Sequence, residues 1–342
     1  MPSESEIILP IIDSHVHLWP ESSVPSLAWC TPSSPLAHQH SITEYRSSAT
    51  TSALLGFIAI EADRAFDADF SAALEEVSFL SRVAQGHPLP DQDQGHRPQD
   101  AALCLAIIPW APMAQGAKVL ESYLDNVRRL AGDAWPKVRG FRYLLQDKPQ
   151  GVMVEEPFID ALKLLGRKGF VFEVAVDQHR RGKKQLEDVV VMIERAHEGV
   201  PEDEKVTFIL NHLCKPDLTI YNLTSDPSFI AWRTTMYTLS TASRTYIKLS
   251  GAFSEMSPSQ RSQSAPEIFR SLLAWLGIVL ATFGPSRIMF ASDWPVCTLD
   301  GLGKDAWCKW RDVVDKMCWM ASLGDVERAM IFGGTAKEAY GL

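Results

Sequence analysis

His15 and His17 stand two residues apart at the end of an apolar run that begins with Ile11 and Ile12. On an extended backbone, residues at this spacing project to the same side, so both imidazoles point at one spot. Two neutral imidazoles supply half of a tetrahedral site for zinc or a similar cation. A surface-exposed histidine pair at a strand end is the alternative, and other parts of the chain must decide between the two.

Polar residues also follow most of the later apolar runs. The groups, in chain order, are Glu61 and Asp63, Arg142 and Tyr143, Glu173 with residues 177–179, residues 211–216, residues 248–251, and residues 292–295. One run ends instead in the apolar pair Pro109 and Trp110, which could line a pocket wall. Such clustering at strand ends is typical of an active site.

Eight short apolar runs are the elements that must position these groups. They cover residues 11–19, 53–60, 102–108, 138–145, 170–176, 206–210, 245–249 and 287–291. Their near-continuous apolar content predicts strands buried on both faces of a parallel sheet. Helical periodicity lies between and after them, at 66–84, 119–130, 158–165, 185–196, 227–240, 265–283, 305–322 and 324–339.

This alternation predicts an α/β protein, a (β/α)8 TIM barrel in which residues 1–342 form one domain. An open doubly wound sheet is the structural alternative, but it would usually carry a glycine-rich phosphate turn, which is missing. Residues 21–51 form a long loop after the first strand and are expected to cover the barrel mouth, with a solvated cap as the alternative. Residues 86–100 are expected at the bottom face, which makes His87 and His96 surface residues.

Composition narrows the function classes. The 342 residues carry a net charge of −9, which argues against a nucleic-acid surface. We expect no signal peptide and no membrane span, because no apolar stretch approaches eighteen residues. The six cysteines form no CxxC pair, which favours reduced thiols and a cytoplasmic protein. The sequence leaves the oligomeric state open, a homo-oligomer included.

Four stretches together resemble the amidohydrolase superfamily (amidohydrolase-2 type), in the branch of sugar lactonases that contains L-rhamnono-γ-lactonases and L-fuconolactonases. The stretches are residues 13–19, 211–216, 248–251 and 292–297. Asn211 and Cys214 depart from the acid and glycine usual in that branch, and Glu61 replaces a glutamine. The metal-bridging lysine of the superfamily is missing, with Arg142 near its station, so one metal ion or none is expected.

The resemblance implies a hydrolase of carboxylic esters that opens a sugar-acid lactone such as L-rhamnono-1,4-lactone. We predict that Asp293 is the general base and acid, that His212 contacts the water or the carbonyl oxygen, and that Arg142 stabilises the oxyanion. One divalent metal ion, zinc by expectation, would be held by His15, His17, Glu61 and Asp293. The predicted substrate contacts are Trp110, Tyr143, His179, Lys215 and Trp294.

Two other functions remain open. One is metal-dependent decarboxylation of an aromatic or muconate-type acid, and the other is a non-catalytic barrel that binds a sugar acid. Several residues also have structural alternatives. His212 could be a core histidine, Asp293 a helix cap, and Glu61, Arg142 and Lys215 partners in ion pairs.

Overall fold

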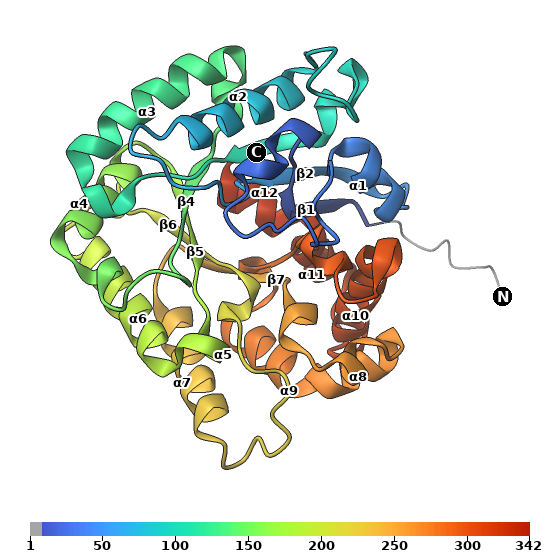
Figure 1. Cartoon of the computed structure of the whole chain (residues 1–342). Helices are drawn as coiled ribbons and strands as arrows, with labels where there is room; N and C mark the ends of the chain where they lie inside the picture. The colour runs from blue at the N-terminus through green and yellow to red at the C-terminus, as the bar shows by residue number, and fades with distance from the viewer. Residues whose placement is uncertain (1–8) are drawn as a thin grey trace.

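Eight parallel strands form the centre of the molecule, as the sequence predicts (Figure 1). The computed structural model describes residues 9–342. The strands are β1 (Ile11–His17), β2 (Leu54–Ile60), β3 (Cys104–Ile108), β4 (Gly140–Leu144), β5 (Val171–Ala175), β6 (Thr207–Leu210), β7 (Thr245–Leu249) and β8 (Ile288–Phe290). Every one of them lies within the apolar run that predicts it.

The strands pair as two parallel sheets, β1-β2-β3 and β4-β5-β6-β7-β8. Isolated parallel bridges join the sheets at both edges. Ile107 pairs with Val138 and Trp110 with Arg142 between β3 and β4, while Val16 pairs with Trp294 beyond the end of β8. The eight strands therefore follow one another around a ring that has regular pairing everywhere except at these two seams.

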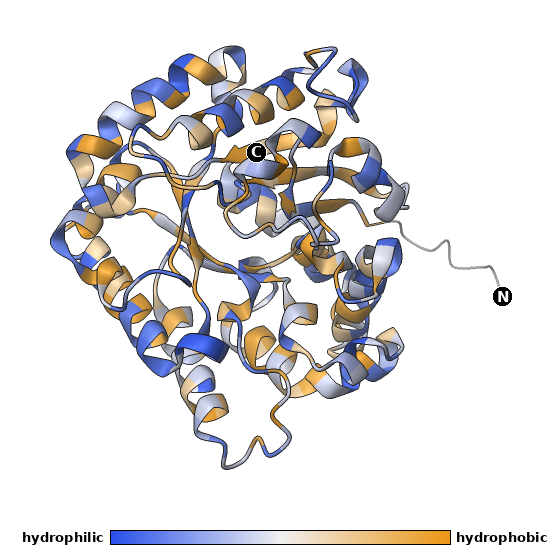
Figure 2. Ribbon diagram, viewed as in Figure 1, coloured by the Kyte–Doolittle hydropathy of each residue, from blue (hydrophilic) through white to orange (hydrophobic). Residues whose placement is uncertain are grey.

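Helices surround the strands and turn their polar faces outward (Figure 2). The long ones are α2 (Ser71–Gln85), α3 (Ala117–Ala131), α4 (Glu156–Arg167), α6 (Lys183–His197), α7 (Pro227–Thr241), α9 (Ala265–Phe283) and α10 (Ala306–Met320). The short ones are α1 (Ile42–Ser48), α5 (Gln178–Arg181), α8 (Pro258–Arg261), α11 (Asp325–Ala329) and α12 (Thr335–Tyr340). A π turn at Met330–Gly334 divides the predicted helix 324–339, where Gly333 passes close to the backbone of Pro10.

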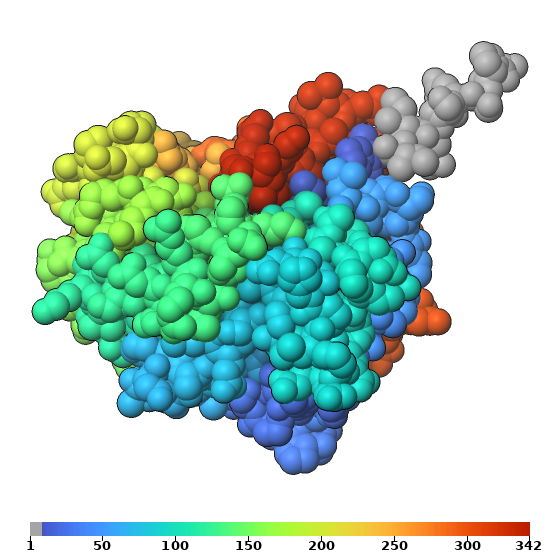
Figure 3. Space-filling view, turned by 90° about the horizontal axis from the view of Figure 1, so that it is seen from above, coloured from blue at the N-terminus to red at the C-terminus, as the bar shows by residue number. Residues whose placement is uncertain are grey.

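Two apolar cores lie on the two sides of the strands. The larger core fills the space between strands and helices, and the smaller one fills the barrel interior with residues such as Ile60, Ile108 and Ile209. Ala339 and Tyr340 of α12 belong to the inner core, so this helix closes the N-terminal end of the barrel. The first residues after β1 and the last residues of the chain, around α12, lie at opposite ends of the molecule (Figure 3).

A bulge in β1 determines which of its side chains enter the barrel. Ile12 belongs to the inner core, and strict alternation from it would turn Ser14 and Val16 inward. The register of β1 against β2 shifts between Asp13 and Val16, and Val16 packs in the outer core instead. The bulge thereby directs His15 and His17 into the barrel.

One buried ion pair lies inside the barrel. Lys248 of β7 donates to both carboxylate oxygens of Glu173 of β5 at 2.7 Å, and both side chains are fully buried. The hydroxyl of Tyr340 from α12 donates to the same carboxylate. The pair thus joins two strands and the helix that closes the barrel.

Two expectations about other segments need correction. Among residues 9–342, α9 is long and apolar enough to cross a membrane, contrary to the expectation that no stretch approaches that length. Its buried face, which includes Leu272, Trp275 and Leu276, packs toward α7 and α10 as a core helix does. His87 is exposed as expected, but His96 is buried against Phe79.

We predict that Lys248→Met destabilises the protein by about 3–5 kcal/mol, because it leaves the Glu173 carboxylate buried without its cation. Urea unfolding measures the change. Lys248→Met combined with Glu173→Gln should recover much of the loss, since no buried charge remains. The matched control is Lys168→Met, which removes the exposed ion pair with Glu121 and should cost about 1 kcal/mol or less. An equally small effect of Lys248→Met would contradict the prediction.

Candidate active site

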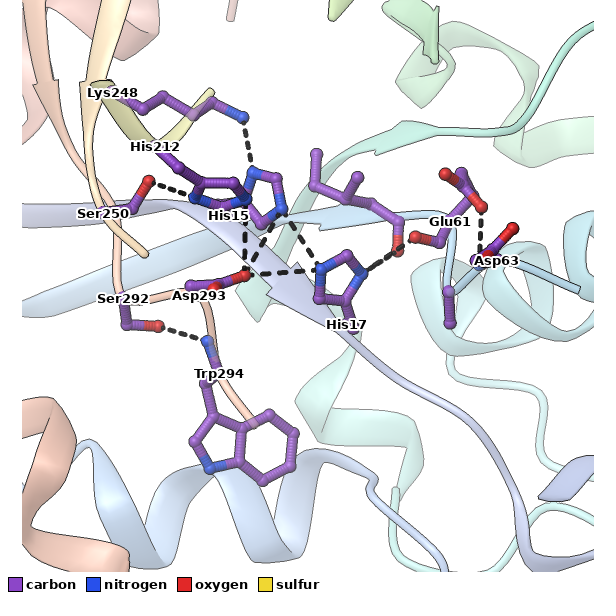
Figure 4. Close-up of polar contacts among 12 residues, drawn as sticks. His15, His17, Glu61, Asp63, His212, Lys248, Ser250, Ser292, Asp293 and Trp294 are labelled. Atoms are coloured by element: carbon purple, nitrogen blue, oxygen red, sulfur yellow. Dashed lines mark hydrogen bonds and ion pairs between the residues drawn. The ribbon is translucent and has the colours of Figure 1, made fainter. Parts of the chain in front are cut away.

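Three imidazoles and one carboxylate converge at the C-terminal ends of the strands (Figure 4). His15 and His17 come from β1, His212 follows β6, and Asp293 follows β8. Asp293 Oδ1 lies 3.6 Å from Nε2 of His17 and 3.7 Å from Nε2 of both His15 and His212. All four residues are buried. The sequence prediction that these residues share one site agrees with this geometry.

The outer nitrogen of each imidazole has its own partner. His17 Nδ1 lies 2.8 Å from the carbonyl oxygen of Glu61, and His212 Nδ1 lies 2.8 Å from Ser250 Oγ. His15 Nδ1 lies 3.2 Å from Lys248 Nζ. These contacts direct all three Nε2 atoms toward Asp293.

The turn after β6 holds His212 in a strained conformation. Four consecutive residues, His212 through Lys215, have positive φ values although none is glycine. The indole of Trp232 donates to the carbonyl of Leu213 at 2.8 Å and braces the turn. Strain of this kind is found where function demands one geometry.

Hydrogen bonds across the β8–β1 seam position Asp293. Its amide donates to the carbonyl of His15 at 3.0 Å, and the amide of His17 donates to the carbonyl of Trp294 at 2.8 Å. Asp293 itself has a φ of +63°, a conformation that aspartate and asparagine tolerate better than most residues. Asp293 and the two histidines of β1 therefore face one another across the seam.

The charge states follow from burial. Burial lowers the pKa of His212 to about 3, and burial followed by the nearby Lys248 lowers the pKa of His15 well below its usual value. Burial alone would raise the pKa of Asp293, but His212 and His17 more than offset this and hold it below its usual value. Neutral imidazoles beside an ionised carboxylate provide a proton acceptor at neutral pH.

A cavity of about 240 Å³ opens onto this cluster. Five residues predicted for the site line it, namely His17, Arg142, His212, Lys215 and Asp293. Trp29 and Leu36, from the predicted mouth-covering loop 21–51, lie on its wall. Lys215 is tied to Gln146 Oε1 at 2.9 Å.

Glu61 does not join the histidine cluster as the metal prediction expects. One carboxylate oxygen accepts from Nε of Arg142 and the other accepts from the amide of Asp63 at 2.6 Å. The ion pair with Arg142, the alternative for Glu61, is the arrangement found. It also holds the Arg142 guanidinium at the cavity wall, with Nη1 3.4 Å from His15 Nε2.

The remaining predicted contacts lie outside this cavity. Trp294 is buried, and its indole donates to Ser48 Oγ at 3.2 Å. His179 lies between the carboxylates of Glu255 and Asp217, at 2.8 and 3.5 Å. Trp110 and Tyr143 line a second cavity beside the first.

Sequence reasoning missed three supporting residues, Lys248, Ser250 and Gly251. The sequence shows residues 248–251 as a strand-end motif, but it does not show that these residues support His15 and His212. Gly251 has a φ of +63°, and a Cβ there would lie 2.6–2.7 Å from atoms of His212. Only glycine lets the histidine pack against this turn.

The donor set fits one divalent cation. Among residues 9–342, His15, His17 and Asp293 are grouped with ligand atoms within 4.8 Å of one another. Three nitrogen and oxygen ligands with an open fourth position are typical of catalytic zinc. His17 shows the usual supporting contact, since the bond of Nδ1 to a carbonyl leaves the Nε2 lone pair facing Asp293.

The fold and the site define a parallel β/α barrel with a His-X-His pair, a third histidine and an aspartate at its strand ends. Residues 12–342 match the model of the amidohydrolase family, and the chain belongs to this family.

Its relatives include sugar lactonases. The chain is 30% identical over 344 residues to the L-rhamnono-gamma-lactonase of Scheffersomyces stipitis, covering 97% of this chain and 98% of that one. It is 30% identical over 211 residues to an L-fucono-1,5-lactonase of Burkholderia multivorans, covering 60% of this chain and 64% of the relative. A zinc-bound amidohydrolase structure from Burkholderia multivorans has a TM-score of 0.71 at 26% identity, covering 97% and 99% of the two chains.

We predict that Gly251→Ala lowers kcat tenfold or more, about 1.4 kcal/mol or more of activation free energy, because the new Cβ pushes His212 away from Asp293. Steady-state kinetics on an accepted substrate and urea unfolding are the measurements. Gly284→Ala is the matched control, since Gly284 has a similar φ of +69° but open space around its Cβ position. If both variants lose stability alike and neither loses kcat, Gly251 has no role in placing His212.

Proposed function

We propose that the chain hydrolyses a sugar-acid lactone, with an aldonolactone such as L-rhamnono-1,4-lactone as the substrate class. The observation that carries the proposal is the Asp293 carboxylate facing the imidazoles of three histidines at a cavity lined by Arg142 and Lys215. The lactonase relatives support the same reaction class. The enzyme is accordingly a hydrolase of carboxylic ester bonds.

In the proposed reaction, Asp293 takes a proton from a water molecule, and the water oxygen attacks the lactone carbonyl. The ring C–O bond then breaks, and Asp293 returns the proton to the departing ring oxygen. The products are the open aldonic acid and its free hydroxyl. One carboxylate thus serves as base and then as acid.

Two cationic groups suit the negative charge that develops. The Arg142 guanidinium, held by Glu61, would stabilise the oxyanion, and such preorganised donors contribute about 3–4 kcal/mol. Lys215, held by Gln146, would contact a substrate hydroxyl or the product carboxylate. His212 would hydrogen-bond the water or the carbonyl oxygen.

One divalent cation, zinc by proposal, would be held by His15, His17 and Asp293. When bound, such an ion lowers the pKa of water or polarises the carbonyl. A cytoplasmic location is part of the proposal, supported by six free cysteines. No specific observation favours decarboxylation or simple binding over hydrolysis.

A panel of aldonolactones, monitored by proton release and carbon dioxide evolution, tests the proposal. Wild-type protein should release acid, whereas a decarboxylase would release carbon dioxide and a binding protein neither. Asp293→Asn should reduce turnover by a factor of about 10²–10⁴ with little change in stability, because asparagine tolerates the positive φ.

The matched control is Asp300→Asn at another aspartate of positive φ (+58°), outside the cavity. It should keep wild-type turnover. Near-full activity of Asp293→Asn on every lactone tried would contradict the role of Asp293.

We predict that His15→Ala with His17→Ala lowers metal content and turnover together, because two of the three ligands are gone. Elemental analysis of the purified proteins and initial rates are the measurements. His87→Ala, at an exposed histidine, is the control and should change neither. Loss of rate at unchanged metal content, or a fully active metal-free wild type, would refute the metal proposal.

A further inference from the structure

A second cavity, of about 180 Å³, lies beside the catalytic one. Its wall combines the aromatic side chains of Phe66, Phe70, Trp110 and Tyr143 with the polar residues Asp63 and Lys148. Tyr143 belongs to β4, and the others come from the segments that follow β2, β3 and β4, on the same end of the barrel as Asp293. The catalytic mechanism does not use this cavity.

Asp63 belongs to both cavities. Figure 4 shows it next to Glu61, away from the histidine cluster. Within residues 9–342 its carboxyl group forms no hydrogen bond or ion pair, although burial, followed by the charge of Glu61, raises its pKa to about 7. A φ of +54° at this residue adds backbone strain. A half-buried carboxyl group in the common wall is therefore free to accept a hydroxyl from a molecule that spans both cavities.

The aromatic residues form an open platform. Trp110 stacks near Phe70 and Tyr143, with ring centroids 5.7 and 6.1 Å apart. Phe66 lies 6.5 Å from Trp110 and is 70% exposed. The Phe66 ring lies against Trp110 but is not covered by other side chains. A flat apolar ligand surface that stacks on Phe66 would therefore remove its ring from water.

The polar groups of the second cavity indicate the kind of ring that would fit. Asp63 and Asp67 offer acceptors, while Lys148 and Gln115 offer donors. A pyranose has an apolar C–H face for the aromatic platform and hydroxyls at its edge that both donate and accept. A plain aromatic ring would leave these polar residues unpartnered.

We propose that the second cavity is a sugar subsite, so that the substrate is an O-glycosylated aldonolactone with its lactone ring beside Asp293 and its glycosyl residue against Trp110 and Phe66. This inference rests on the proposed lactonase function. Asp63 accepts hydroxyl hydrogen bonds at the junction of the two rings. Binding energy from the remote ring then increases kcat/KM for the glycosylated substrate.

The test compares L-rhamnono-1,4-lactone with its derivatives that carry β-D-glucosyl or benzyl on O2, O3 or O5. For at least one position, the glucosyl derivative should have a kcat/KM roughly tenfold above the plain lactone, and above the benzyl derivative. Phe66→Ala should bring that ratio back toward one. The control Tyr237→Ala, at a tyrosine 66% exposed elsewhere on the surface, should leave the ratio unchanged.

Two results would overturn the subsite while leaving the lactonase proposal intact. One is hydrolysis of the plain lactone with no glucosyl derivative preferred, and the other is equal preference for benzyl and glucosyl. A Phe66→Ala ratio that stays at the wild-type value would also overturn it. If no lactone of the set is hydrolysed, the proposed function fails, and the inference fails with it.

Discussion

The ion pair between Lys248 and Glu173 is the constraint on which the barrel interior depends. Two fully buried charges lie inside the barrel, and removing such charges from water is costly unless every polar atom is satisfied. The contact within the pair and two neighbouring side chains meet that condition. Lys248 bonds both oxygens of Glu173, Tyr340 bonds the same carboxylate from below, and His15 lies above the ammonium group. The helix that closes the barrel and the first histidine of the site are thus positioned by one pair of charges.

The seam between β8 and β1 supplies the second constraint. Regular sheet pairing is replaced there by a single bridge and by the buried Asp13, which accepts from the amide of Ser292 at 2.8 Å, from Tyr45 and from Trp307. Because β1 bulges at this point, its histidines face inward while Asp13 faces the outer helices. The irregularity that weakens the ladder is the same one that sets the histidines opposite Asp293.

Sequence periodicity predicts the strands well because continuous burial leaves a strong apolar signal, and it brings His15, His17, His212 and Asp293 to one end of the barrel. Periodicity fails where the role of a strand-end residue depends on which side chains it contacts in the folded protein. Glu61 looks like a ligand, yet Arg142 occupies its carboxylate. The bulge in β1 and the left-handed turn after β6 have no periodic signature.

The same limit explains the predicted substrate contacts. Trp110, Tyr143 and Trp294 all stand at strand ends, but a side chain there can point into the barrel, toward the helices or into a seam. The structure turns Trp294 into the core and the other two into the second cavity. The position of a residue in the sequence predicts at which end of the barrel it lies. The packing of its side chain determines which cavity it lines.

The hydrogen bonds of His15 determine whether its Nε2 atom can bind a cation beside Asp293. Two groups that can only donate flank the His15 ring, because Lys248 Nζ lies 3.2 Å from Nδ1 and Arg142 Nη1 lies 3.4 Å from Nε2. A neutral imidazole has one ring proton and one lone pair, so His15 can accept from only one of these two cations. His17 has no such conflict, since its Nδ1 donates to the carbonyl of Glu61 and its Nε2 keeps the lone pair. A metal ion beside Asp293 would need the lone pair of His15 on Nε2, and it would therefore compete with Arg142 for that atom and move the ring proton to Nδ1, opposite Lys248.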